Sequence, residues 1–215
     1  MKSMTVAVAL LVFFGLRALA QQMPASQPQS APNMMAMHHD HDHASGAPIS
    51  YADLKDTVSR LERARQATAK YQDARIAEAD GYQAIGPDVP GMGIHYVLSA
   101  RRDGFDLEKP PILLYEKNSS APGGYSLVGV SYLLTAAEGP DGQPVTSPFP
   151  KSLAVWHRHE NICVLPDRST PMGLSEGQCR EKGGQFTAET QWMVHAWIWK
   201  DSPLGVFSPT NPAVL

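Results

Sequence analysis

The stretch Trp192-Met193-Val194-His195-Ala196-Trp197-Ile198-Trp199 decides the fold, because apolar or aromatic residues occupy both alternating faces of an extended chain. A strand that is apolar on both faces is typical of a sheet that is covered on both sides. The sequence therefore predicts a central strand at 191–199. We interpret its three tryptophans as core residues rather than as a platform for a ligand.

Four further β-like runs precede this strand, and clusters of proline and glycine separate them. These runs are 94–98, 112–116, 126–134 and 152–161. None of the gaps between them has the pattern of a crossover helix, which a parallel pair of strands requires. We therefore expect a mostly antiparallel sheet and an α+β fold.

A long helix is predicted before the first strand. Residues 51–80 contain neither glycine nor proline, and Ser50 is a suitable N-cap with Asp53 in the first turn. One helix, or two helices with a break, is expected to end at Gly81. The residues at helical spacing that predict its buried side are Leu54, Val58, Leu61, Arg65, Thr68 and Tyr71.

The first twenty residues have the pattern of a secretory signal peptide. Lys2 supplies the positive start, residues 5–16 the apolar core, and Ala18-Leu19-Ala20 the small residues of a cleavage site. The apolar core is shorter than the roughly 20 residues that a membrane-spanning helix needs. We expect cleavage near Ala20, no transmembrane span, and a periplasmic or secreted protein.

The next segment, 21–49, is rich in Gln, Pro, Ser, Ala, Met and His. It has almost no large apolar residue to bury, so it cannot offset the entropy cost of ordering. We expect a disordered Met/His-rich arm at 21–49 and a single α+β domain at 50–215.

The charge of the chain argues against two classes of partner. The formal net charge is −3, and removal of residues 1–20 with Lys2 and Arg17 changes it to −5. An acidic chain without a basic block is not expected to bind nucleic acid or an anionic membrane surface.

The two cysteines, Cys163 and Cys179, both lie in the predicted domain. In an oxidising compartment such a pair predicts a disulfide bond. The alternatives are a thiolate metal ligand beside His157 and His159, or a reactive thiol.

The eight histidines form two groups, of which four lie in the predicted domain: His95, His157, His159 and His195. On a strand at 152–161, His157 and His159 would project to one face and form half of a metal site. His95 and His195 lie in apolar runs, where an unpaired imidazole costs about 1–3 kcal/mol and so needs a carbonyl, a carboxylate or a metal. The alternative is that all four are core or surface residues without a ligand.

The second group lies in the arm, directly after a cluster of three methionines. Thioether sulfur suits Cu(I), and imidazole suits Cu(II), Zn(II) and Ni(II), so this mixture favours copper over zinc. A low-complexity linker is the alternative. The candidate ligands of this weaker site are Met34, Met35, Met37, His38, His39, His41 and His43.

Several short motifs resemble a group of exported bacterial proteins of unknown function. They are Lys70-Tyr71-Gln72-Asp73, Ala79-Asp80-Gly81-Tyr82, Gly91-Met92-Gly93-Ile94-His95-Tyr96, Leu113-Leu114-Tyr115, Leu127-Val128-Gly129-Val130, Trp156-His157-Arg158-His159 and the ending from Gly205-Val206-Phe207 to Asn211-Pro212. The resemblance implies export and one α+β domain, and it implies no activity. In that group an acidic residue often follows the Leu-Val-Gly-Val run, whereas Ser131 stands here.

Three functions follow as hypotheses. The first is an exported metal-binding protein, copper before zinc. The second is a metal-dependent hydrolase or oxidoreductase, in which Glu160 or Glu116 would act as a general base. The third is a non-catalytic envelope binding domain with core histidines. The sequence leaves open whether the protein is an enzyme and which proteins it contacts.

Overall fold

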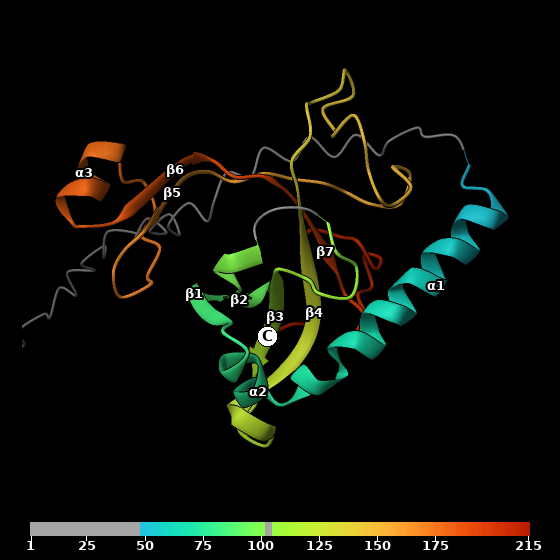
Figure 1. Ribbon diagram of the computed structural model, residues 1–215, viewed down its shortest axis with the longest axis horizontal. Helices are drawn as coiled ribbons and strands as arrows, with labels where there is room; N and C mark the ends of the chain where they lie inside the picture. Colours follow the sequence, from blue (N-terminus) through green and yellow to red (C-terminus); the bar gives the residue numbers. More distant parts are fainter. Residues whose placement is uncertain (1–47, 102–104) are drawn as a thin grey trace, which may run out of the picture. The chain divides into compact units, whose positions relative to one another are not determined.

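The computed structural model describes residues 48–101 and 105–215 (Figure 1). The predicted signal peptide lies outside the described residues, as does the predicted arm apart from Pro48 and Ile49. The described residues belong to one compact unit. Among these residues, no helix is both long enough and apolar enough to cross a membrane.

Three helical segments open the described chain: α1 (Tyr51–Thr68), the 3₁₀ helix η1 (Ala69–Gln72) and α2 (Ala74–Ala79). Ser50 caps α1 as predicted, because its hydroxyl accepts a hydrogen bond from the Asp53 N–H. Asp73 caps α2 in the same way through the N–H of Arg75. The predicted helical stretch is therefore divided at η1, where a second cap restarts the helix.

The predicted buried side of α1 is wrong in its first turns. Leu54 and Val58 are 42% and 59% exposed, whereas Thr57 and Ala64 are buried; Thr68 and Tyr71, further along, are buried as predicted. The two threonine hydroxyls donate hydrogen bonds to carbonyls one turn earlier, at 2.7 and 2.8 Å. Their polar groups are therefore satisfied within the helix, and their small side chains allow close packing.

Five strands form one antiparallel sheet in the order β1-β2-β3-β4-β7. The α+β class and the antiparallel sheet are confirmed. The strands are β1 (Gln83–Val89), β2 (Gly93–Val97), β3 (Ile112–Lys117), β4 (Tyr125–Leu134) and β7 (Trp192–Ala196). The prediction missed β1, which contains Gly86 and Pro87, two residues that are typical of turns. Proline is tolerated there because β1 is an edge strand with an irregular register.

The prediction that 191–199 is a central strand is wrong, because β7 lies at the end of the strand order. Its outer edge is covered at one point by His157, which exchanges two backbone hydrogen bonds with Met193 at 2.7 and 2.9 Å. Side chains on both faces of β7 are nevertheless buried. The apolar pattern therefore indicated burial correctly, but not position in the sheet.

The prediction of a strand at 152–161 is also wrong. Residues 151–153 form a turn, His157 makes an isolated bridge, and β5 (Glu160–Val164) begins later. Asn161 has a positive φ of 54°, a left-handed conformation that interrupts the alternation of a strand. His157 and His159 therefore do not project side by side from one regular strand, as the prediction required.

A separate two-stranded ribbon pairs β5 with β6 (Gln185–Glu189), and the short helix α3 (Glu176–Glu181) lies at its outer end (Figure 1). A disulfide joins Cys163 on β5 to Cys179 on α3, and both residues are buried. The predicted disulfide is confirmed, so the alternatives of a thiolate ligand and a reactive thiol are wrong. Two further 3₁₀ turns are η2 (Ser99–Arg101) and η3 (Pro122–Gly124).

The two faces of the five-stranded sheet carry different cores. On the first, which we call the helix face, residues of α1, η1 and α2 pack against the larger of two apolar clusters, which includes Tyr96, Leu113, Tyr115, Val130, Tyr132 and Val194. The second, which we call the histidine face, carries a smaller cluster, and register places His95, Ser131 and His195 on it. Its apolar members are Ile112, Leu114, Val128, Leu133, Met193, Trp197 and Val214.

Candidate metal centre

The four histidines of the domain converge on one another. The ring centroids of His95 and His195 lie 5.5 Å apart, those of His195 and His157 lie 5.1 Å apart, and those of His157 and His159 lie 5.2 Å apart. The rings therefore follow one another in a row, which we call the histidine row. Two of its members come from strands β2 and β7, and two from the segment before β5.

Curvature of the sheet brings the first two rings together. In a flat sheet, three strand spacings of about 4.8 Å would separate β2 from β7. The approach of His95 to His195 therefore shows that the sheet curls toward the histidine face. Gly129 permits this close packing, because a Cβ atom there would lie 2.8 Å from the carbonyl oxygen of Ala196 and 3.1 Å from the ring of Trp197.

The C-terminal tail, by which we mean residues 205–215, fixes the orientation of His195. The Nδ1 atom of His195 lies 2.7 Å from the carbonyl oxygen of Pro209, and the neighbouring Trp197 donates its indole N–H to the carbonyl of Ser208 at 2.7 Å. Because a carbonyl only accepts, His195 must carry its proton on Nδ1 in the neutral form. The lone pair of Nε2 is then available, as in histidines that bind a metal through one nitrogen and donate the other to a carbonyl.

Two buried polar atoms on this face make no hydrogen bond: Nε2 of His195 and the hydroxyl oxygen of Ser131. Both residues are fully buried, and they stand directly opposite each other on β7 and β4. Buried polar atoms are nearly always satisfied, and an exception calls for an explanation such as an ion or a water molecule. The position next to His195 is therefore the part of the row with the clearest capacity for a ligand.

The protonation state of the inner rings also suits metal binding. Burial lowers the pKa of His95 to about 4, with a smaller contribution from His159. Burial also lowers the pKa of His195 well below its ordinary value, helped by His157 and His95 and opposed by the bond to Pro209. Both rings are therefore neutral at pH 7, and the neutral imidazole is the form that coordinates a metal.

The spacing of neighbouring rings matches a shared ion, but the row is not a closed site. Two imidazoles bound to one ion at about 2.0–2.1 Å have centroids roughly 5 Å apart. However, the described residues contain no group of three or more His, Cys, Asp or Glu side chains in a geometry that holds a metal. His157 is nearly perpendicular to both His159 and His195, at 90° and 83°. Since no three of these side chains are grouped as ligands in the described residues, a three-ligand site would need a change of side-chain conformation.

The remaining candidates lie elsewhere. All seven candidate ligands of the arm lie outside the described residues. Glu160 is exposed on β5, and Glu116 forms an ion pair with Lys200 at 2.6 Å in a pocket that none of the four histidines lines. Glu116 is therefore held by an ion pair away from the histidine row, whereas the role of Glu160 stays a prediction.

The comparisons with known proteins are negative. No family model, curated protein or solved structure matches the chain. The resemblance to exported bacterial proteins therefore stays a prediction.

Sequence reasoning missed the tail as part of this site. The tail is held against the turn between β1 and β2 by hydrogen bonds from the Asn211 N–H to the Gly91 carbonyl and from the Gly91 N–H to the Val214 carbonyl, at 2.7 and 3.1 Å. The carbonyl of Pro209, which orients His195, carries no signal in a sequence because every residue has a carbonyl. The sequence drew attention to Ser131 only because the exported proteins that the chain resembles often have an acidic residue at this position.

Proposed function

We propose that this chain is an exported metal-binding protein whose structured site is formed by His95, His157, His159 and His195. The observation that carries the proposal is the state of His195: Nδ1 donates to Pro209, and the buried Nε2 makes no hydrogen bond. A metal ion bound to Nε2 would satisfy this atom. The other three imidazoles follow along the histidine row, and those next to His195 would supply further nitrogen ligands.

In the proposed site, His195 is the central ligand because its ring neighbours both His95 and His157. Neighbouring pairs along the row are spaced so that two imidazoles can share an ion. Rotation of the side chain of His157 or His159 would add a third ligand. Such a partly assembled site suits an ion that is bound and released rather than one that is held permanently as part of the structure.

The choice of copper before zinc depends on the arm, where methionine sulfur and histidine nitrogen occur together. Imidazole ligands alone accept either metal. An extracytoplasmic location is consistent with the Cys163–Cys179 disulfide. We propose that the arm collects ions weakly and that the histidine row holds them.

The experiment is a metal titration of untagged mature protein by calorimetry, with copper and with zinc, together with measurement of the metal that copurifies. A second protein carries alanine at His38, His39, His41 and His43, and a third carries His195→Gln. The control is Leu114→Ile, which changes a buried side chain beside His95 but removes no nitrogen.

We expect tight binding in the wild-type, arm-variant and control proteins. We expect His195→Gln to weaken the tight site by about 100-fold or more, because it removes the central ligand. If neither metal binds the wild-type protein, the proposal is wrong. If binding is lost only in the arm variant, the histidine row is not the site.

A further inference from the structure

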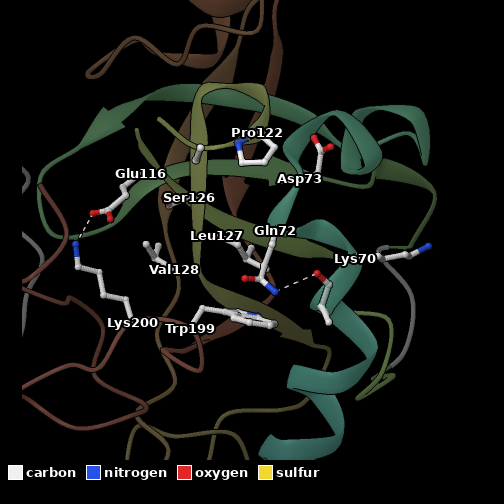
Figure 2. A pocket seen from close by; sticks show the side chains of 12 residues that line it. Lys70, Gln72, Asp73, Glu116, Pro122, Ser126, Leu127, Val128, Trp199 and Lys200 are labelled. Carbon is white, nitrogen blue, oxygen red and sulfur yellow. Dashed lines mark hydrogen bonds and ion pairs between the residues drawn. The ribbon is translucent and has the colours of Figure 1, made fainter. Parts of the chain in front are cut away.

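An open pocket lies apart from the histidine row, between η1, the beginning of β4 and the residues that follow β7 (Figure 2). Its volume is about 680 Å³, which lies in the usual range of roughly 300–1,000 Å³ for small-molecule sites. The residues that matter for recognition are Gln72, Asp73, Glu116, Ser126, Trp199 and Lys200.

The aromatic wall of the pocket is held rigidly. The carbonyl of Val128 accepts hydrogen bonds from the backbone N–H groups of Trp199 and Lys200, at 3.2 and 3.0 Å. The indole N–H of Trp199 donates to the hydroxyl of Thr68 at 3.1 Å, and the guanidinium of Arg65 lies 4.7 Å from its ring centroid. Trp199 is only partly buried, so a preformed aromatic surface lines the pocket.

The charges of the pocket are already balanced. Lys200 pairs with Glu116 at 2.6 Å, and both side chains are partly buried. Asp73 pairs with Arg75 at 2.6 Å, and Lys70 pairs with Asp80 and points away from the pocket (Figure 2). A phosphate or a metal ion would have to compete with these ion pairs, so the pocket favours a neutral ligand.

The uncharged polar groups can serve a ligand with hydroxyl groups. Gln72 is exposed, and its amide lies above Trp199 in Figure 2. Ser126 accepts a hydrogen bond from Asn118 and keeps its own O–H to donate. The Glu116–Lys200 pair offers an acceptor and donors that can bind hydroxyls without adding net charge.

From these features we infer that the pocket binds a neutral saccharide of one or two rings. One apolar sugar face would stack on Trp199, and the hydroxyls would bond to Gln72, Ser126 and the Glu116–Lys200 pair. An aromatic surface with a few convergent polar groups is the usual composition of such a small-molecule site. The inference is independent of the proposed metal site, since none of the four histidines lines this pocket.

The test is calorimetry of the full mature protein with N-acetylglucosamine, chitobiose, maltose and cellobiose, each to about 10 mM, beside inorganic phosphate and a neutral dipeptide. The first variant is Gln72→Ala, which is exposed and should not affect folding. Its matched control is Gln66→Ala, another exposed helical glutamine, which bonds to Glu62 away from the pocket. A second variant, Trp199→Phe, keeps an aromatic ring but reduces the stacking surface and removes the indole N–H that bonds to Thr68.

We expect at least one saccharide to bind, with affinity reduced about tenfold by Gln72→Ala and by Trp199→Phe and unchanged by Gln66→Ala. Circular dichroism of both variants checks that they fold. The inference is overturned if no saccharide binds, if phosphate or the dipeptide binds there instead, or if both pocket variants bind saccharide as the wild type does.

Discussion

The helix face and the histidine face of the sheet are both buried, but they differ in how their polar groups are satisfied. On the helix face, the hydroxyls of Tyr82, Tyr115 and Tyr132 donate to backbone carbonyls at 2.6–2.8 Å. On the histidine face, Nε2 of His195 and the hydroxyl of Ser131 make no hydrogen bond. The tyrosine hydroxyls of the first face are thus satisfied, and the second face carries the unsatisfied atoms on which the proposed metal site depends.

The largest expected effect is on the helix face. Tyr115→Ala removes a ring that is fully buried and packs against Tyr96, so we expect a loss of about 3–5 kcal/mol in the free energy of unfolding. Denaturant unfolding measures it. Metal affinity of the protein that remains folded should not change; an equal loss of metal binding would show that the two faces are not separate.

The next effect concerns the ribbon of β5 and β6. Replacement of Cys163 and Cys179 by serine removes the disulfide that closes the loop, and the chain-entropy model gives a loss of roughly 3 kcal/mol. Thermal unfolding under non-reducing conditions measures it. An unchanged melting temperature would show that the ribbon does not unfold together with the sheet.

A pH dependence should come from the histidine face. Because the folded-state pKa of His95, about 4, and that of His195 lie below the ordinary value of 6.5, the unfolded chain binds more protons between these values. Stability should therefore fall as the pH drops from about 6.5 toward 4, and these rings should contribute no dependence above that range. Urea unfolding of metal-free protein at several pH values measures the trend, and His95→Gln should flatten it.

The smallest expected effects compare removal of one hydroxyl from each face. Tyr115→Phe deletes a hydrogen bond to the Tyr71 carbonyl and should cost about 1 kcal/mol. Ser131→Ala deletes a buried hydroxyl that makes no bond, so stability should stay equal or rise by up to about 1 kcal/mol. Urea unfolding compares the two, and a clear loss in Ser131→Ala would contradict the difference between the faces.

Sequence patterns predicted most of the sheet, because β2, β3, β4 and β7 are apolar runs between turn residues. The patterns failed where the course of a strand depends on the backbone conformation of one or two residues. Gly86 and Pro87 lie inside β1 only because an edge strand tolerates a bulge, and the positive φ of Asn161 ends the alternation expected near His157. Thr57, which α1 buries, was missed because it is a polar residue whose hydroxyl bonds within the helix.

The candidate site was predictable only as a set of residue types. The sequence singled out the four histidines of the domain, but their convergence depends on the curl of the sheet and on the path of the tail. The orientation of His195 by the Pro209 carbonyl depends on tertiary structure alone. The pocket was missed because all three tryptophans of the aromatic run were interpreted as core residues. Trp192 and Trp197 are buried, but Trp199 is only partly buried and lines the pocket.

The most direct measurement is the nitrogen NMR spectrum of the histidine rings at pH 7, first without metal and then during a titration with Zn(II), which is diamagnetic. We predict that His195 carries its proton on Nδ1 and that its Nε2 resonance shifts and saturates as zinc is added. A proton on Nε2, or an Nε2 resonance that zinc leaves unchanged, would contradict the claim that the histidine face holds a metal-binding imidazole.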